Sequence, residues 1–223
     1  MMDKNERAIK LMKEQKYEEA AGLFNDIIEE NPKDPVGYIN FGNLLQHIND
    51  AERAWRFYER AIELDGNAAT AYYGLGNLCY EESDYPRAQK YLLKTIEIGL
   101  EEADAYYLLG MTFFHQEQYK LSLPYLMRAA ELSPEDTEYL FQYGLSLAQS
   151  EHVDEAKPVF QEVLKLDDDH SDAHYNLGVV ALYEESLSAA LDHFNQALAI
   201  QPEHVLAANA KKQIMEVWDN TEM

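Results

Sequence analysis

The sequence gathers carboxylates and two histidines in the short segment from Asp167 to His174. His170 and His174 are four residues apart, and histidines at that spacing on one helix can share a metal ion. The other histidines are scattered, and no serine, histidine and aspartate arrangement or glycine-rich phosphate loop can be placed. This segment is therefore the strongest candidate in the chain for a metal site or for catalytic chemistry.

The elements that would hold this segment follow from a strict internal repeat of 34 residues. Its clearest markers are glycines that recur at the same repeat position: Gly42, Gly76, Gly110, Gly144 and Gly178. Repeats 2 to 6 have bulky or apolar residues at positions 4, 7 and 11 and a small one at position 8, spacings that place all four on one helical face; the first repeat departs from this with Lys4 and Arg7. A second set at positions 20, 24 and 27 predicts a second, antiparallel helix. Such a period is typical of stacked repeats that bury their apolar faces only against their neighbours.

The turn chemistry agrees with two helices in each repeat. Prolines at position 32 predict the end of the second helix: Pro32, Pro134 and Pro202. Residues at position 16 predict its N-cap: Asp50, Asp84 and Ser186. Pro86 fits the first turn of a second helix, where its missing N–H costs little. Pro124 and Pro158, at position 22, predict that two of the second helices begin late or bend there.

These residues resemble the tetratricopeptide repeat (TPR) family, whose pattern of Leu-Gly, Tyr, Ala, Phe and Pro falls at these offsets, although no repeat here has the family's Trp at position 4. The resemblance covers residues 1–204 and implies an all-α fold, a right-handed α-α superhelix of six helix-turn-helix units. The expected repeats are 1–34, 35–68, 69–102, 103–136, 137–170 and 171–204. A capping helix over 205–218 would close a single domain of residues 1–223. The chain looks most like the short free-standing cytosolic TPR proteins of bacteria.

The repeat register also gives the histidine segment a simpler interpretation. It falls at the junction between repeats 5 and 6, and His174 takes core-facing position 4, so we interpret it as a solvated turn and a packed histidine. A metal-binding protein that uses residues 167–174 stays as an alternative. Cys79 likewise occupies an apolar position, which predicts a buried, inert thiol. We predict no catalytic residue, no metal and no cofactor, and expect that the protein is not an enzyme.

Charge limits the possible partners. The net charge is −23; residues 1–102 carry 20 acids and 12 bases, and residues 103–223 carry 21 acids and 6 bases. Nucleic acids and anionic membranes need cationic surfaces, so both are excluded, and basic partners are favoured. The charged amino terminus argues against a signal peptide, and no run of residues approaches a membrane span. We expect a cytoplasmic location.

In TPR proteins the exposed side of the first helices lines a concave groove that binds partners. The resemblance therefore implies groove residues at positions 2, 5, 6 and 9 of the repeats. Position 5 carries an aromatic ladder, which either binds a ligand or only packs between helices: Tyr73, Tyr107, Phe141 and Tyr175. Positions 6 and 9 are amides in the N-terminal half: Asn40, Asn43 and Asn77. Position 9 becomes apolar and position 2 acidic in the C-terminal half: Met111, Leu145 and Val179; Asp104, Glu138 and Asp172.

This surface predicts a ligand with apolar or aromatic anchors and neighbouring Lys or Arg, as an extended segment or an amphipathic helix. The chaperone-binding TPR domains grip a C-terminal dicarboxylate with cations at positions that here hold Asn5, Thr70 and Gly74, so an acidic peptide tail is an unsuitable ligand. We predict a monomeric adaptor or assembly factor that binds a segment of another protein. A self-assembling scaffold, joined through the closing helix or through Trp55 and Trp218, is the alternative.

Overall fold

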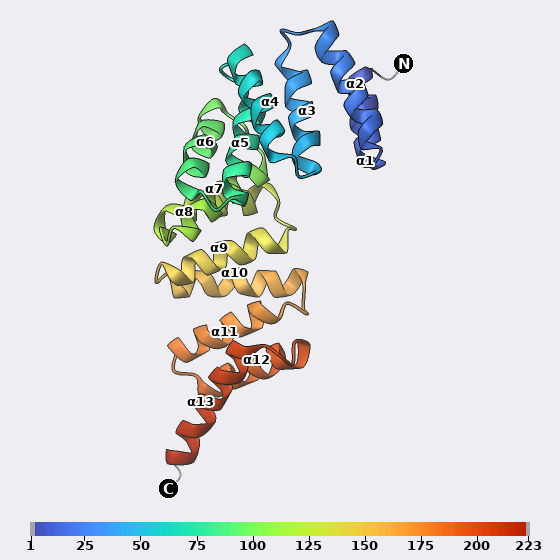
Figure 1. Ribbon diagram of the computed structural model, residues 1–223. Coiled ribbons are helices and arrows are strands. Elements are labelled where there is room, and N and C mark those ends of the chain that lie inside the picture. The colour runs from blue at the N-terminus through green and yellow to red at the C-terminus, as the bar shows by residue number, and fades with distance from the viewer. Residues whose placement is uncertain (1–2, 222–223) are drawn as a thin grey trace. The chain divides into compact units, whose positions relative to one another are not determined.

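The structure, a computed structural model, describes residues 3–221, with the side chains of residues 3–216 (Figure 1). Over this range all regular elements are α-helices, which confirms the predicted fold class. The helices are α1 (Lys4–Lys13), α2 (Tyr17–Glu30), α3 (Pro35–His47), α4 (Ala51–Leu64), α5 (Ala69–Glu81), α6 (Tyr85–Ile98), α7 (Ala103–His115), α8 (Tyr119–Leu132), α9 (Thr137–Gln149), α10 (Val153–Leu166), α11 (Ser171–Tyr183), α12 (Leu187–Ile200) and α13 (Val205–Thr221).

The chain divides into two compact units, Met1–Gln116 and Glu117–Met223, which we call unit 1 and unit 2. In unit 1 the pairs α1 and α2, α3 and α4, and α5 and α6 each form one repeat, and α7 packs on α6. In unit 2, α8 packs on α9, α9 pairs with α10, α11 pairs with α12, and α13 packs on α12 (Figure 1). The single domain over residues 1–223 stays a prediction.

Local chemistry places the helix ends where the repeat pattern predicts them. The Asp50 carboxylate accepts a hydrogen bond from the Arg53 N–H at 3.2 Å, and Asp84 caps α6 in the same way. Ser186 stands at the N-cap of α12 but makes no capping bond through its side chain. The helices α2, α8 and α12 end two residues before their prolines, as predicted: Pro32, Pro134 and Pro202.

Of the two outcomes predicted at the position-22 prolines, the late helix start is wrong, and the bend stays a prediction. Helices α8 and α10 begin at Tyr119 and Val153, the same repeat position at which the other second helices begin, and Pro124 and Pro158 lie inside them. A proline removes one backbone hydrogen bond to the carbonyl four residues earlier. Both prolines and the residues with those carbonyls, Lys120 and Asp154, are exposed, so water can satisfy the freed carbonyl.

The reversal between the two helices of a repeat uses a left-handed residue at position 15 that is never glycine. The values of φ lie between 58° and 68° at Gln15, Asn49, Ser83, Glu117, Glu151 and Glu185. Among these types only asparagine is enriched in the left-handed region. The residue types at position 15 therefore do not predict the left-handed turn, which depends on the packing of the two flanking helices.

The repeat glycines allow the second helix to approach the first, as predicted. A Cβ atom on Gly42 would lie 2.7 Å from the Tyr58 ring, and one on Gly178 would lie 2.5 Å from Phe194. Tyr58 and Phe194 are completely buried, so neither ring has free space in which to move. Cys79 is buried too, and burial raises the pKa of its thiol, as expected of an inert cysteine.

Candidate functional site

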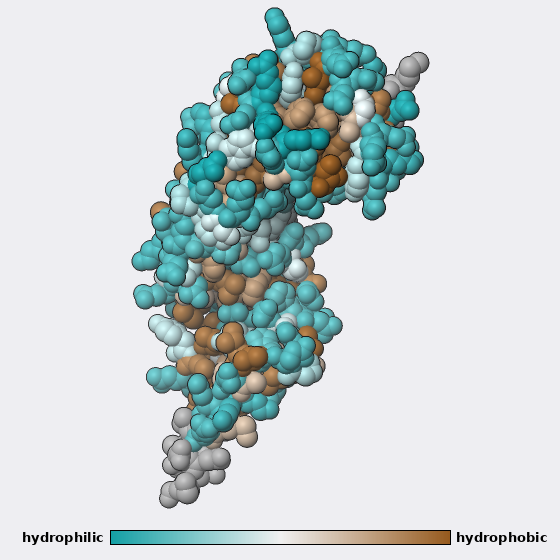
Figure 2. Space-filling model, in the orientation of Figure 1, coloured by the Kyte–Doolittle hydropathy of each residue, from teal (hydrophilic) through white to brown (hydrophobic). Residues whose placement is uncertain are grey.

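The main surface cleft in unit 2 lies over the first helices α9 and α11 and the first turn of α13, and its volume is about 540 Å³. It contains five residues that the sequence placed in the groove: Phe141, Leu145, Asp172, Tyr175 and Val179. Figure 2 shows apolar surface over these helices, bordered by hydrophilic side chains. These five side chains therefore lie around one hollow.

The floor of the cleft is aromatic and belongs partly to the core. The Phe141 ring lies 5.9 Å from the Phe160 ring between centroids, and the Tyr175 ring lies 5.8 Å from that of Phe194. Phe141 is only 7% exposed, whereas Tyr175 is half-buried. The position-5 aromatics of unit 2 thus pack against second helices and also line the cleft.

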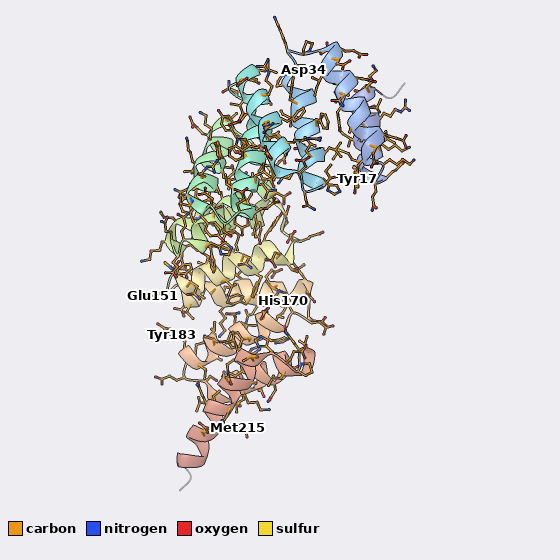
Figure 3. All side chains as sticks on the ribbon, viewed as in Figure 1. Tyr17, Asp34, Glu151, His170, Tyr183 and Met215 are labelled. Atoms are coloured by element: carbon orange, nitrogen blue, oxygen red, sulfur yellow. The ribbon has the colours of Figure 1, made fainter. Side chains whose placement is uncertain are left out.

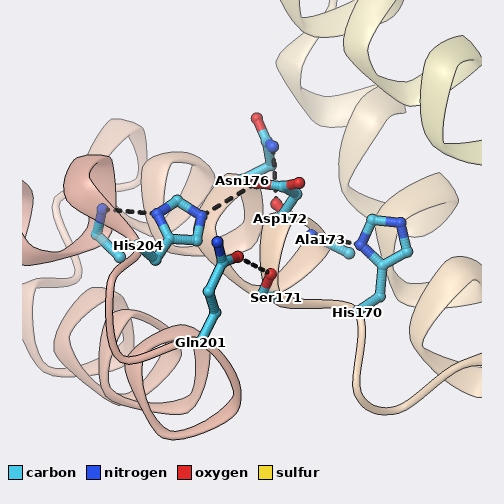
Figure 4. Close-up of polar contacts among 8 residues, drawn as sticks. His170, Ser171, Asp172, Ala173, Asn176, Gln201 and His204 are labelled. Carbon is cyan, nitrogen blue, oxygen red and sulfur yellow. Dashed lines mark hydrogen bonds and ion pairs between the residues drawn. The ribbon is translucent and has the colours of Figure 1, made fainter.

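Two histidines cap the helices that border the cleft (Figure 4). The Ala173 N–H donates to His170 Nδ1 at 3.1 Å at the start of α11, and the Ala207 N–H donates to His204 Nδ1 at 3.2 Å at the start of α13. Each imidazole also faces a cleft aromatic: His170 lies 4.6 Å from Phe141, and His204 lies 5.2 Å from Tyr175, between ring centroids. The capping histidines therefore support the floor of the cleft from below.

One of these histidines also holds the acidic residue of the cleft. His204 Nε2 lies 3.0 Å from Asp172 Oδ1. Because His204 Nδ1 accepts from a backbone N–H, its proton is on Nε2, and this N–H donates to the carboxylate. Asp172 remains 57% exposed at its side chain, so it still presents negative charge to the solvent beside the cleft.

Sequence reasoning missed two residues at the rim of the cleft. Tyr183, at the end of α11, is 71% exposed, and Leu206, in the first turn of α13, is 57% exposed. Figure 3 shows Tyr183 and Glu151 at the same edge of the repeats. Both residues have a place in the repeat register. Tyr183 is at position 13 of the sixth repeat, and Leu206 is at position 2 of a seventh repeat, so the register could have pointed to both.

Several of the groove residues predicted in unit 1 are occupied by contacts within that unit. Asn40 donates to Asn5 Oδ1 at 3.2 Å, and Asn43 accepts from the Tyr58 hydroxyl at 2.8 Å. Burial, and after it the charge of Asp104, raises the pKa of Tyr73 to about 12. The other four differ in exposure, since Met111 is buried, Asn77 and Tyr107 are half-buried and Asp104 is exposed.

Glu138 is the one predicted residue of unit 2 that does not line the cleft. Its carboxylate is exposed at the start of α9 and accepts from Gln142 Nε2 at 2.9 Å. Whether any of the predicted residues binds a ligand stays a prediction.

The structure does not pair the two histidines of the candidate metal segment. His170 is the N-cap of α11, whereas the His174 ring turns towards α12, where its Nδ1 lies 3.4 Å from Nδ1 of His193. Within residues 3–216, no three His, Cys, Asp or Glu side chains are arranged to hold a metal ion. His174 is half-buried, in agreement with the packed histidine that the register predicts.

The His174 and His193 pair is expected to make unit 2 sensitive to acid. Burial lowers the pKa of both imidazoles. Repulsion from His170 lowers the pKa of His174 further, and repulsion from His174 lowers that of His193. A lowered pKa means that the folded state favours neutral imidazole, so stability is complete above about pH 6.5 and is lost as the pH falls through the folded-state values. Urea denaturation of the wild type between neutral and mildly acidic pH is expected to show this loss.

A matched variant separates this pair from the other titrating groups. His193→Gln removes one imidazole and leaves Asp168, Asp192 and Lys157, the charged groups around the pair, in place. The variant is expected to lose less stability than the wild type over the same pH interval. Equal losses would assign the pH dependence to other residues.

Comparison with known proteins places this helical architecture in a family. The described helices make this chain one of the class of stacked helix-turn-helix repeat proteins. Family models of the tetratricopeptide repeat match residues 39–99, 103–136 and 142–205. The chain belongs to the tetratricopeptide repeat family. Members of this family bind other proteins and peptides.

Solved structures of other proteins resemble this chain as well. A crystal structure of YrrB, described as a TPR protein with an unusual peptide-binding site, is 46% identical with a TM-score of 0.82, over 85% of this chain and 97% of YrrB. A separate alignment with the Bacillus subtilis YrrB sequence gives 51% identity over 41 residues, which are 18% of this chain and only 20% of that protein. MamA from Desulfovibrio magneticus RS-1 is 22% identical, with a TM-score of 0.68 over 77% of this chain and 97% of MamA, and so shows the fold alone.

Within the described part of the chain, no helix combines the length and the apolar character that a membrane span requires.

Proposed function

We propose that this chain is a non-enzymatic adaptor or assembly factor that binds a peptide segment of another protein in the unit 2 cleft. The observation that carries the proposal is the cleft itself, in which Leu145, Tyr175 and Val179 present apolar surface beside the exposed carboxylate of Asp172. Clefts of this size, mostly apolar with a few polar groups, are the usual form of a binding site.

The negative charge of unit 2 favours a basic partner segment. Residues 117–223 carry 20 acidic and 6 basic side chains, a net charge of −14. A ligand with Lys or Arg beside its apolar anchors is therefore attracted, and acidic competitors are rejected. The apolar anchors supply most of the affinity, because carboxylates as exposed as Asp172 contribute little to stability or binding. The same charge opposes binding of nucleic acids.

A substitution that tests peptide binding must leave the hydrophobic core intact. Phe141 packs against Phe160 and His170, so its removal would disturb packing as well as binding. Val179 is 41% exposed and lies in the cleft, and Leu166 is 43% exposed at the end of α10 and does not line it. These two residues make a matched pair of positions for substitution.

The proposal predicts that Val179→Ser weakens binding of a synthetic Leu/Lys peptide about tenfold, because the lost burial of one aliphatic side chain is worth about 1.5 kcal/mol. Fluorescence anisotropy of the labelled peptide measures this, and Leu166→Ser is expected to bind as the wild type does. A Leu/Glu peptide is expected to bind more weakly than the Leu/Lys peptide, because the net charge of unit 2 repels it. Equal affinities of the Val179 and Leu166 variants would show that the cleft is not the site.

A further inference from the structure

We infer that helix α13 is part of the binding site, and that its first turn forms one wall of the cleft. This inference rests on the proposed function of the cleft and names the residues and ligand features on which recognition depends. The sequence assigned α13 only a capping role, and a terminal cap needs a polar outer face to remain soluble. Val205 and Leu206, at its start, are instead 68% and 57% exposed.

Part of the apolar exposure of α13, at Leu206, is located at the cleft. Leu206 lines the same hollow as Val179 and Tyr183, whose exposed fractions are 41% and 71%. In the repeat register, Leu206 takes the position that Asp172 and Glu138 hold in the two preceding repeats. The acidic edge of the groove therefore ends in an aliphatic side chain, which extends the apolar surface beyond the last complete repeat.

His204 fixes this wall in place. It is 5% exposed, its Nδ1 accepts the Ala207 N–H, and its Nε2 donates to Asp172 on α11 at 3.0 Å. The same ring packs against Tyr175 in the cleft floor. One imidazole thus joins the start of α13 to Asp172 of α11 (Figure 4) and also contacts Tyr175 of the same helix. Leu206 follows His204 by two residues, so this connection also determines where its side chain lies. We assign His204 as a positioning residue.

Charge identifies the occupant as a basic segment of a different protein. A second copy of this chain would bring another unit of net charge −14 against the same surface, and like charges disfavour that contact. Carboxylates lie at both ends of α11, with Asp172 at its start and Glu184 and Glu185 just after its end. Lys157 neutralises Glu184 through contacts of 2.7 and 2.8 Å, and Glu185 is exposed.

These two acidic ends also define the length of the ligand. The rise of a helix places Asp172 and Glu185 about 20 Å apart along the direction of α11, a distance that an extended chain covers in about six residues. The expected ligand is an extended segment with apolar residues for Val179 and Leu206, flanked by Lys or Arg at a separation of about six residues.

The test compares two substitutions on the same helix. Leu206→Ser and Met215→Ser both remove an apolar side chain from α13 at similar exposure, 57% and 50%, but Met215 lies outside the cleft. With the Leu/Lys peptide as probe, Leu206→Ser is expected to weaken binding about tenfold. Met215→Ser is expected to bind as the wild type does.

The outcome separates this inference from the proposed function. If Val179→Ser weakens binding and Leu206→Ser does not, the cleft binds the peptide and the assignment of α13 is wrong. If neither substitution weakens binding, both proposals fail. If light scattering shows that the protein self-associates and Leu206→Ser prevents it, the occupant is a second copy, and a basic segment as partner is ruled out.

His204→Asn tests the positioning role independently. Asparagine is a good N-cap and keeps α13 helical, but it loses the ring contact with Tyr175 and the bond to Asp172. Peptide affinity is expected to fall by about fivefold to tenfold, because Asp172, Tyr175 and Leu206 lose the side chain that positions them, while the helix content measured by circular dichroism is unchanged. Affinity equal to the wild type would limit His204 to a capping role.

Discussion

Replacing Tyr58 by alanine is expected to lower the free energy of unfolding by about 3–5 kcal/mol, as for other large aromatic side chains in a packed core. Tyr58 is completely buried between two first helices, against Gly42 of its own repeat and Gly74 of the next. Its hydroxyl lies 2.8 Å from Asn43 Oδ1 and 2.9 Å from Gln46 Oε1. Urea denaturation followed by circular dichroism measures the loss, and a loss below about 1 kcal/mol would mean that the helices close over the cavity.

Gly74 provides the internal control for Tyr58. A Cβ atom on Gly74 would lie 2.4 Å from Tyr58 Cζ, so Gly74→Ala is expected to cost about 1–3 kcal/mol in the wild type. In the Tyr58→Ala background the clash is absent, and alanine becomes better than glycine within the helix by about 0.5–1 kcal/mol. A change of sign between the two backgrounds would establish direct coupling of the pair. The next repeat pair has the smaller Leu92 and the larger Leu108 at these positions.

Gly178→Ala is expected to destabilise unit 2 by about 1–3 kcal/mol and to weaken peptide binding with it. The new methyl group would lie 2.5 Å from Phe194 Cε1, and Phe194 is completely buried, so α11 and α12 must separate. Helix α11 carries Asp172, Tyr175 and Val179, and its displacement changes the cleft. Denaturation and peptide anisotropy on the same variant measure the two effects.

The matched control is another helical glycine. Gly22, within α2, is exposed, and a Cβ atom there would meet nothing within 4 Å. Gly22→Ala is expected to raise the free energy of unfolding by about 0.5–1 kcal/mol, because alanine restricts the unfolded chain and favours the helix. Opposite signs for Gly22 and Gly178 are the expected result. Destabilisation of similar size at both glycines would contradict the packing argument.

The sequence alone was sufficient for the repeated elements of this protein. The packing roles of the small residue at position 8 and of the bulky residue at position 24 could be predicted from their helical spacing. Asp50, Asp84 and the prolines at position 32 marked helix ends that the structure confirms. These features are local or recur in every repeat, so one chain contains six copies of the same information. The apolar character of Leu145 and Val179 could be assigned to the same surface for the same reason.

Only the tertiary structure decided which of those positions form a cleft. Met111 has the same repeat position as Leu145 and Val179 but is 6% exposed, and Asn40 and Asn43 use their amides in bonds within unit 1. Sequence periodicity gives a direction around one helix, but exposure depends on the side chains that neighbouring helices bring to it. His204 joins α13 to α11 through a contact between residues about 30 positions apart, which no local pattern predicts. The repeat register gives Leu206 its position, but only the structure shows that its side chain lines the cleft.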